Sequence, residues 1–328
     1  MGIKKDKKEL FSRIRKANTI FLMAHDNLDL DALGSIIGLY VICQKKRKKC
    51  YIIIDEKSHE DGVNKVLKEL TGCLDIIKSS EIEEKMHPRQ NKNLLIILDV
   101  NKEEIVQSKK ALELIDNKVI LDHHNTGKTT IKDAYKIIDE DVSSTCEMIS
   151  NMVEAYDIEL DPYYATVLLA GIVLDTNNFT LKTSSNTYYS AYYLSCLGAS
   201  AQKVQYLLKQ NIEEYTKREK MLSDIETVKN KIAITKSNPH TINRREDLAK
   251  VADTLLFFNN IEASFVVGRI SKNEIGISAR SLGDYDINKV LNEFKGGGDD
   301  FHGAATVEGT VISPVITKLK KILEEDED

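Results

Sequence analysis

The sequence predicts an α/β protein in which a parallel-sheet domain precedes a second, smaller α/β domain. Three observations support this prediction. Short apolar runs alternate with helix-like segments in the first half of the chain, which is the pattern of right-handed βαβ units around a parallel sheet. The chain has 328 residues, more than one hydrophobic core usually serves. A long, charged, helical stretch then precedes a second set of strands and helices.

Four strands are expected in the first domain, because parallel sheets that are buried on both faces use short runs rich in Ile, Leu and Val. These runs are Thr19–Ala24, Tyr51–Ile54, Leu94–Leu98 and Lys118–Leu121. Between the first two, Ala32–Cys43 carries apolar residues at helical spacing and is expected to form a helix.

Capping signals place the later helices of this domain. Ser144-Thr145-Cys146-Glu147 has the S-x-x-E pattern of a capping box. Asp161-Pro162 combines an N-cap residue with a proline at the first helical position, and this helix is expected to end at Asp175. A further helix over about Thr187–Leu197 precedes Gly198, which is typical of the C′ position.

The stretch 201–229 is expected to be a helical connector between a domain at 1–200 and a domain at 230–328. The second domain is predicted to contain strands Ile232–Thr235, Ala263–Val267 and Ile275–Ala279, and helices Asp247–Phe257, Ile287–Phe294 and Pro314–Leu323. Gly296-Gly297-Gly298 is expected to interrupt these elements, because a glycine run suits neither a packed helix nor a packed strand.

The composition favours a cytoplasmic enzyme. A net charge of -5 argues against a protein that binds long nucleic acid through its phosphates, because such binding needs a basic surface. This charge still allows a short or cyclic nucleotide to bind through a few local contacts. The 5 cysteines lack C-x-x-C spacing and indicate reduced thiols. No apolar run approaches the roughly 18 residues of a membrane span, and the lysine-rich start is no secretion signal. Membrane anchoring is expected only if the chain is a fragment of a longer protein.

Four segments carry acidic or histidine residues directly after an apolar run. They are His25–Asp31, Asp99, Asp122-His123-His124 and Asp175. Since the ends of such runs converge on one crevice of an open parallel sheet, these side chains are expected to lie close together. Their carboxylates would repel one another without cations between them, so the pattern predicts a dinuclear metal site.

Carboxylate and imidazole ligands favour Mn²⁺, with Mg²⁺, Fe²⁺ or Co²⁺ as alternatives, over a structural zinc site that would prefer thiolates. His25, Asp29 and Asp31 lie in one loop and can supply two neighbouring cations. Asp99 is the natural bridging ligand, and His123 and Asp175 would complete the ligand set of the second cation. Two such metals can clamp a phosphoryl group and activate a water.

Each of these residues also has an ordinary explanation. An aspartate after a strand is usually an N-cap or turn residue, the role assigned to Asp55 and Asp116. An adjacent His-His pair is weak evidence by itself. The metal-site interpretation is preferred because four such segments occur in order, each behind an apolar run.

The second domain offers residues that suit a phosphate. Gly296-Gly297-Gly298 is either a flexible turn or a loop whose backbone N–H groups cradle a phosphate. Arg280 at a strand end is either a surface residue or a ligand-binding residue whose guanidinium group hydrogen-bonds a phosphate or stacks on a base. Together they suggest a substrate-holding domain.

These motifs, in this order, resemble the DHH phosphoesterase superfamily over nearly the whole chain, as a catalytic DHH domain followed by a DHH-associated substrate-binding domain. Two stretches most resemble the bacterial cyclic-di-AMP phosphodiesterases, namely Gly276–Gly283 and Gly171–Phe179. The resemblance implies two Mn²⁺ ions and hydrolysis of cyclic-di-AMP to linear pApA.

The resemblance also implies residue roles. One metal is expected on His25 and Asp29, the other on Asp31, His123 and Asp175, with Asp99 bridging. Catalytic roles are expected for Asp99, His123 and His124, with His124 contacting phosphate. The remaining expected substrate contacts are Arg280, Ser278, Gly296, Gly297, Gly298 and His302.

The chain departs from the family pattern at two places. Where the family usually has Asn-Pro-Asp, this chain has Asn27-Leu28-Asp29, which keeps the expected ligand but lacks the proline. The glycine run continues as Asp299-Asp300-Phe301-His302, so that Asp300 stands where the family has histidine. An acidic residue there repels phosphate, and His302 could substitute if the loop shifts by two residues.

Three functions are therefore considered. The first is a Mn²⁺-dependent phosphodiesterase for cyclic-di-AMP. The second is a nanoRNase-like hydrolase of pApA and short oligonucleotides. The third is a nucleotide-binding sensor with weak turnover, which only Asp299-Asp300 favours. The expected partner is a cyclic or short linear dinucleotide, without long nucleic acid or membrane contact by this chain, and a homodimer is left open.

Overall fold

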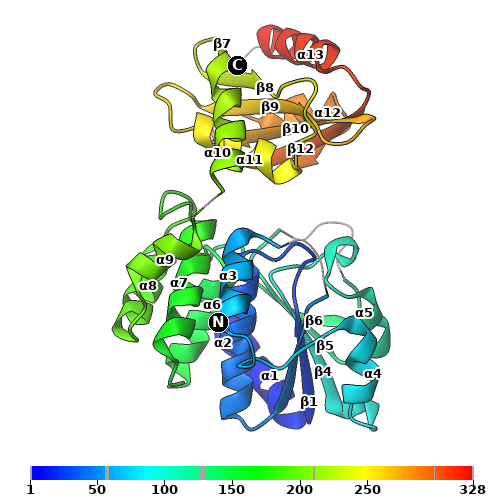
Figure 1. The fold of residues 1–328 in the computed structure, drawn as a ribbon, viewed down its shortest axis with the longest axis vertical. Helices are drawn as coiled ribbons and strands as arrows, with labels where there is room; N and C mark the ends of the chain where they lie inside the picture. The colour runs from blue at the N-terminus through cyan, green and yellow to red at the C-terminus, as the bar shows by residue number, and fades with distance from the viewer. Residues whose placement is uncertain (1, 56–58, 126–130, 210, 299, 327–328) are drawn as a thin grey trace. The chain divides into compact units, whose positions relative to one another are not determined.

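The computed structural model describes residues 2–55, 59–125, 131–209, 211–298 and 300–326. The chain forms two compact units, 1–209 and 210–328, and each is described separately below (Figure 1). Residues 201–229, which the sequence marks as a connector, are divided between these units. Helix α9 (Ala201–Leu207) packs against α3 and α7 in the first unit, whereas α10 (Ile212–Glu219) and η4 (Lys220–Asp224) belong to the second.

The first unit contains a six-stranded sheet in the order β3-β2-β1-β4-β5-β6, with every pair parallel. The strands are β1 (Thr19–Met23), β2 (Lys49–Ile53), β3 (Ile76–Ile77), β4 (Asn93–Leu98), β5 (Lys118–Asp122) and β6 (Ala134–Ile138). Strands β2 and β3 extend the sheet to one side of β1, and β4 to β6 extend it to the other. The carboxyl ends of β1 and β4 therefore lie at a topological switch point, where open α/β sheets place their ligands.

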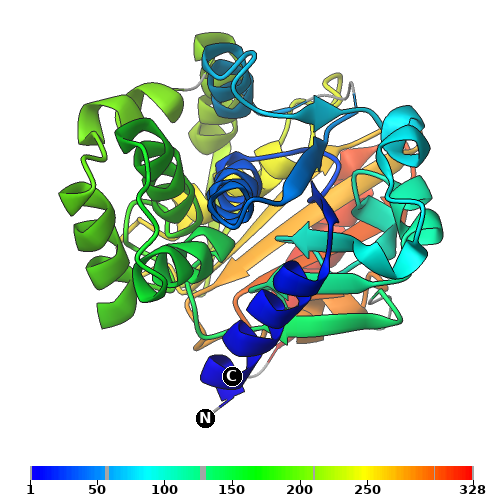
Figure 2. The same cartoon turned by 90° about the horizontal axis from the view of Figure 1, so that it is seen from below.

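Helices cover both faces of this sheet. They are α1 (Gly2–Lys16), α2 (Leu30–Lys45), α3 (Asp61–Glu69), α4 (Ile82–Lys85), α5 (Lys109–Leu114), α6 (Thr145–Ala155), α7 (Pro162–Asp175) and α8 (Ser185–Cys196), with short 3₁₀ helices η1 (Ser79–Glu81), η2 (Gln90–Lys92) and η3 (Glu103–Ile105). Figure 2 shows the green helices on one side of the strands and the cyan helices on the other.

The alternation of side chains along each strand explains the two covered faces. Ile20 and Leu22 of β1 pack in the core shared with α1, α2, α6 and α7. Phe21 and Met23 point to the opposite face, into the core shared with α4 and α5. All five residues of β1 are buried. Because both faces are covered, the strand sequence is apolar throughout.

A glycine allows α7 to pack closely against α2. A Cβ on Gly171 would lie 2.9 Å from the Leu30 carbonyl oxygen and 2.9 Å from the Asp31 Cα, both backbone atoms. Only glycine therefore fits at this crossing. The close packing brings the first turn of α2 beside the last turn of α7.

The second unit contains a mixed sheet in the order β11-β12-β10-β9-β8-β7, in which only β8 and β9 pair in parallel. The strands are β7 (Glu226–Val228), β8 (Ile232–Lys236), β9 (Ala263–Arg269), β10 (Glu274–Ser281), β11 (Gly297–Gly298) and β12 (His302–Glu308). Helix α11 (Arg245–Leu255) covers one face, and α12 (Ile287–Asn292) and α13 (Ile312–Glu325) cover the other.

The structure confirms the α/β class, the four predicted strands of the first sheet and the three of the second. The sequence analysis did not predict helices α1, α3, α4 and α5 or strands β3, β6, β7 and β12. The expectation about the glycine run was wrong, because Gly297–Gly298 forms an edge strand paired with β12. The glycines permit this pairing, since a Cβ on Gly298 would lie 1.9 Å from the His302 carbonyl oxygen.

The helix ends agree with the capping signals, with one correction. Ser144 caps α6 by accepting from Glu147 N, but the Glu147 carboxylate accepts from Ser143 N rather than closing the box. Asp161 caps α7, and Gly198 has a φ of +93° at the end of α8. Among the described helices, none combines the length and apolar character that crossing a bilayer requires.

Candidate metal centre

The acidic and histidine residues singled out in the sequence meet at the carboxyl edge of the first sheet. Each one is placed by the end of an element: His25 follows β1, Asp29 is the N-cap of α2, Asp31 lies in its first turn, Asp99 follows β4, His123 follows β5, and Asp175 is the last residue of α7. Segments that are 150 positions apart along the chain (residues 25 and 175) therefore contribute to one site.

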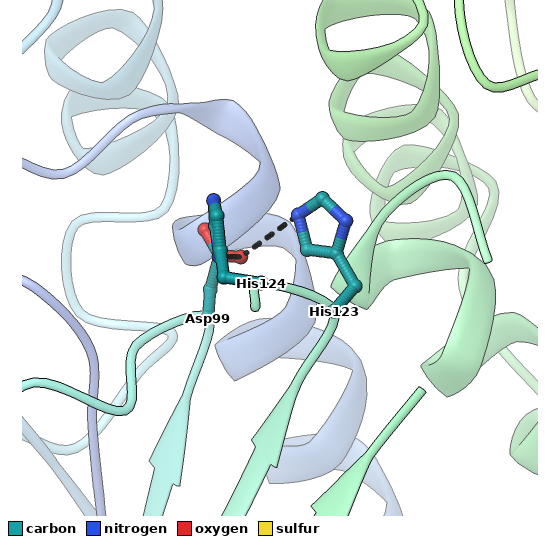
Figure 3. A group of neighbouring side chains, drawn as sticks. All are labelled: Asp99, His123 and His124. Carbon is teal, nitrogen blue, oxygen red and sulfur yellow. Dashed lines mark ion pairs between the residues drawn. The ribbon is translucent and has the colours of Figure 1, made fainter. Parts of the chain in front are cut away.

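These residues form three overlapping groups, and within each group the ligand atoms lie within 4.8 Å of one another. The groups are His25, Asp29 and Asp99; Asp31, His123 and Asp175; and Asp99, His123 and His124. Figure 3 shows the last group, with Asp99 at the end of one strand and both histidines at the end of the next.

Asp99 lies between the first two groups. Its Oδ2 is 3.6 Å from His25 Nε2, and its Oδ1 is 3.5 Å from His123 Nε2. The outer carboxylates are also near these rings, since His25 Nε2 lies 3.8 Å from Asp29 Oδ2 and His123 Nε2 lies 3.1 Å from Asp175 Oδ2. The two oxygens of Asp99 thus face two separate sets of donors.

Buried His123 carries ring nitrogens that a cation could engage. The side chain is almost fully buried, yet neither ring nitrogen has a hydrogen-bond partner in the part of the chain that the structure describes. An unsatisfied buried polar group is costly unless something else engages it. A divalent cation beside His123 Nε2 would do so, and it would find carboxylate oxygens at the same place.

The charges of the centre support the same conclusion. Burial, and then the charges of Asp175 and Asp99, raise the pKa of Asp31 well above its usual value. Burial, and then the charges of Asp29 and Asp99, do the same to the pKa of Asp175. Carboxylates crowded in this way repel one another until protons or cations neutralise them.

His25 stabilises one carboxylate of the centre. Burial opposes ionisation of Asp29, but the neighbouring His25 imidazole outweighs it and lowers the Asp29 pKa to about 2. Burial by itself would lower the pKa of His25, but the nearby carboxylates of Asp29 and Asp99 raise that pKa well above normal overall. Asp29 and His25 are therefore favoured as an ion pair when no metal is bound.

The backbone at Asp99 is strained. Asp99 is almost completely buried, and its φ of +59° lies in the left-handed region, which residues other than glycine adopt uncommonly. Strain of this kind persists only where the surrounding structure enforces it, and it concentrates at functional sites. Here it aims the carboxylate between the two histidines.

The N-terminus of α6 holds two of the carboxylates, a feature that the sequence analysis missed. Thr145 N and Cys146 N donate to the two oxygens of Asp31 at 2.8 Å and 2.7 Å. The Thr145 hydroxyl donates to Asp99 Oδ1 at 3.0 Å. The available signal was the capping sequence itself, because a helix N-terminus is a ready site for an anion.

Asp122 was named in its segment without a role, and Asn101 was missed as a contributor to the site. Asp122 is completely buried, and its Oδ1 accepts a hydrogen bond from His124 Nδ1 at 2.8 Å while its Oδ2 accepts one from Asn101 Nδ2 at 2.5 Å. Burial opposes protonation of His124, but the carboxylates of Asp122, Asp99 and Asp175 outweigh it and raise the pKa of His124 to about 9. The side chain of His124 is 56% exposed, so Asp122 orients a cationic ring at the surface of the centre.

The substrate residues expected in the second unit gather on adjacent strands. Arg280 on β10 is opposite His302 on β12, and Ser278 is opposite Ala304. Gly298 on β11 pairs with Gly303 on the other edge of β12. Asp300 is exposed after this strand, whereas Asp299 lies outside the described residues.

The guanidinium group of Arg280 is partly engaged by other residues of the protein. Its Nε donates to Asp253 Oδ1 at 2.6 Å, and its Nη1 donates to the Ala279 carbonyl oxygen at 2.9 Å. Asp253 on α11 was not predicted from the sequence. Because this bond uses one edge of the guanidinium group, Asp253 determines which N–H groups of Arg280 remain for a ligand.

Comparisons with known protein families agree with this architecture. Residues 19–172 match the model of the DHH family, N-terminal domain, and residues 229–325 match the model of the DHHA1 domain. Together the two matches span more than half of the chain.

The chain is similar to curated and solved proteins. It is 31% identical to a cyclic-di-AMP phosphodiesterase, GdpP, of Geobacillus thermodenitrificans over 94% of this chain and 48% of that protein. Identity to GdpP of Bacillus subtilis is 31%, over 95% of this chain and 48% of that protein. The chain thus spans about half the length of these relatives. The crystal structure of an exopolyphosphatase-related protein from Bacteroides fragilis has the same fold, with a TM-score of 0.77, 20% identity and coverage of 98% of this chain and 97% of that chain.

Proposed function

The chain belongs to the DHH family, and on that premise we propose that it is a metal-dependent phosphodiesterase that hydrolyses cyclic-di-AMP to linear pApA. The observation that carries this proposal is the pair of donor groups joined by Asp99. The curated relatives named above are cyclic-di-AMP phosphodiesterases, which supports the choice of substrate.

The donor set fits two divalent cations. His25 and Asp29 would hold one ion, Asp31, His123 and Asp175 would hold the other, and Asp99 would contact both. Oxygen and imidazole donors without thiolate favour Mn²⁺, with Mg²⁺, Fe²⁺ or Co²⁺ as alternatives. Such a pair of ions, when bound, supplies Lewis-acid activation of the phosphodiester and a water of lowered pKa.

The chain's own residues would then position the substrate. The Asp122 carboxylate holds His124 Nδ1, which leaves Nε2 on an exposed ring to donate to a phosphate oxygen. The α6 N-terminus keeps the Asp31 carboxylate in place through two backbone N–H groups. These groups are oriented before substrate arrives, which is how an enzyme favours the charge of a transition state.

In the second unit we assign substrate contacts to the end of the sheet formed by β10, β12 and β11. Arg280, restrained by Asp253, would present its remaining N–H groups to a phosphate. Ser278, His302 and the Gly296–Gly298 backbone lie on the same strands or beside them. The exposed carboxylate of Asp300 would weaken phosphate binding there, so we expect a modest affinity.

The proposal is tested by a substrate panel. Purified protein with Mn²⁺ is incubated with cyclic-di-AMP, pApA or a short oligonucleotide, and products are separated by chromatography. Cyclic-di-AMP should yield pApA faster than pApA yields mononucleotide. Faster cleavage of pApA would instead assign the nanoRNase-like activity, and binding without any cleavage would assign a sensor.

An Asp99→Ala variant provides the control. Loss of a shared carboxylate weakens both cation sites, so the rate should fall by about 10³-fold or more, the scale on which catalytic metals act. Elemental analysis should show less bound metal than in the unaltered protein. Full activity in this variant would exclude the proposed centre.

A further inference from the structure

Two aromatic rings stack just beyond the end of α7, the helix that ends at Asp175, and have no role in the proposal above. The rings of Phe179 and Tyr188 have centroids 5.5 Å apart and planes within 18° of parallel. Phe179 is partly buried against the main core, whereas Tyr188 is 57% exposed. The stack therefore has one ring fixed by the protein and one ring open to solvent.

The backbone that presents Phe179 is strained. Asn177, Asn178 and Phe179 have consecutive φ values of +44°, +60° and +63°. Asparagine tolerates this region, but a bulky aromatic residue there is a true outlier. Strain at such a residue points to a functional constraint on where its ring lies.

The strained turn closely follows a candidate metal ligand along the chain. It begins two residues after Asp175, and Phe179 N donates to the hydroxyl of Thr176 at 3.0 Å. The backbone N–H of Asn178 donates to the Val173 carbonyl oxygen at 2.8 Å. Both bonds hold the ring against the end of α7, the element that carries Asp175.

The other ring lies next to a residue that is hydrogen-bonded to α6. The hydroxyl of Thr187, next to Tyr188, donates to Glu147 Oε2 at 2.8 Å. Glu147 lies in the first turn of α6, beside Cys146, whose N–H donates to Asp31. Helices α7 and α8 are antiparallel, because a Cβ on Gly198 after α8 would lie 3.2 Å from Pro162 at the start of α7. The start of α8 therefore lies beside the end of α7.

We propose that Phe179 and Tyr188 form a stacking site for one nucleobase of a dinucleotide substrate. The inference rests on the proposed phosphodiesterase function and deepens it by naming a base-binding element. An exposed aromatic face binds any base through its π-surface, and tyrosine loses little conformational freedom in doing so. The site would hold a base while its phosphodiester lies at the centre formed by Asp175 and Asp31.

The test compares Tyr188 with another tyrosine of the same helix. Tyr192 is 65% exposed and packs in a tilted pair with Tyr189, without a strained backbone. Tyr188→Ala should raise KM for cyclic-di-AMP by about 10- to 100-fold with little change in kcat, the range expected for loss of one stacked base. Tyr188→Phe should retain the normal KM, and so should Tyr192→Ala.

Calorimetry without added metal gives a second readout, free of turnover. Tyr188→Ala should weaken cyclic-di-AMP binding by a factor similar to its effect on KM. Phe179→Leu, which stays apolar where Phe179 meets the core, should weaken binding in the same direction. If both variants bind and react as the unaltered protein does, the stacking site is excluded.

A cyclic dinucleotide whose two bases are replaced by hydrogen separates stacking from any other effect. The unaltered protein should bind it more weakly than cyclic-di-AMP, and Tyr188→Ala should cause no further loss. An equal loss for both ligands would overturn the proposal, because the side chain would then not be contacting a base. Failure of the unaltered protein to cleave cyclic-di-AMP would contradict the proposed function, whereas the calorimetric comparison would still decide the stacking site.

Discussion

At the scale of single residues, the centre depends on side chains that hold the candidate ligands as much as on the ligands themselves. Asp31 accepts two backbone N–H groups, and Asp99 accepts the hydroxyl of Thr145. Outer groups of this kind orient ligands and tune their affinity for metal. Thr145 is the clearest case, since one residue supports both carboxylates.

Replacing Thr145 separates its two contributions. Thr145→Val removes the hydroxyl but keeps the backbone N–H to Asp31, and it should lower metal affinity by about 10-fold or more. Thr145→Ser keeps the hydroxyl and should bind metal normally. Isothermal titration with Mn²⁺ measures both variants, and equal affinities would show that the bond to Asp99 is unimportant.

Protons and cations should compete for the centre. The folded-state pKa values of Asp31 and Asp175 are raised, so the stability they contribute is full below the unfolded Asp pKa of about 3.9 and is lost as pH rises through the raised values. The raised pKa of His25 acts in the same direction above its unfolded value of about 6.5.

We therefore expect the metal-free protein to lose stability as pH rises from about 4 through these raised pKa values. The increase in Tm caused by saturating Mn²⁺ should become larger over the same interval. Thermal melts with chelator and with Mn²⁺ at several pH values provide the measurement. An increase in Tm that does not depend on pH would contradict this electrostatic account.

At the scale of elements, glycines allow the close contacts that build both units. Gly171 lets α7 approach α2, and Gly298 lets β11 approach β12. The sequence showed where these glycines lie but not what they face. A glycine run looks like a turn when viewed alone, whereas the paired strand supplies the reason for the missing side chains.

Two neighbouring glycines of β11 should respond differently to substitution. Gly298→Ala places a Cβ 1.9 Å from the His302 carbonyl oxygen, so β11 must separate from β12. In Gly297→Ala the Cβ meets nothing closer than the Asn288 side chain at 3.9 Å. We expect Gly298→Ala to lower the free energy of unfolding by about 1–3 kcal/mol and Gly297→Ala to change it little.

Chemical denaturation followed by circular dichroism compares these two variants. Neither glycine has a positive φ, so the comparison depends on space rather than on backbone conformation. Similar stability in both variants would show that the edge pairing of β11 contributes nothing.

At the scale of the whole molecule, each unit has its own cores. The first unit buries one core on each face of its parallel sheet, and the second unit does the same with its mixed sheet. All candidate metal ligands lie in the first unit. Metal binding should therefore stabilise one unit more than the other.

Differential scanning calorimetry tests this separation. Two transitions are expected, because chains with separate cores often depart from a single two-state transition. Saturating Mn²⁺ should raise the transition of the first unit, and Asp99→Ala should abolish that shift. Phe265→Ala, in the core of the second unit, should lower the other transition by itself. A single transition whose temperature changes with both Mn²⁺ and Phe265→Ala would contradict independent stabilisation of the two units.

Much of the fold could be predicted from the sequence. Buried strands such as β1 and β4 are continuous apolar runs, and the caps at Ser144 and Asp161 depend on local hydrogen bonds. The weaker elements were missed because their patterns are short or polar. Strand β6, for example, is mostly half-buried and lies at the sheet edge.

The sequence by itself determined which residues stand at the ends of buried strands, because apolar runs and the polar residues that follow them are local features. His25, Asp99 and His123 could be selected in this way, and the prediction that they converge followed from the parallel sheet. Only the tertiary structure revealed what supports them. The bonds from Thr145 to Asp99 and from Asp253 to Arg280 join positions that are 46 and 27 residues apart along the chain. A hydrogen bond depends on distance and angle in space, and no local sequence pattern encodes these.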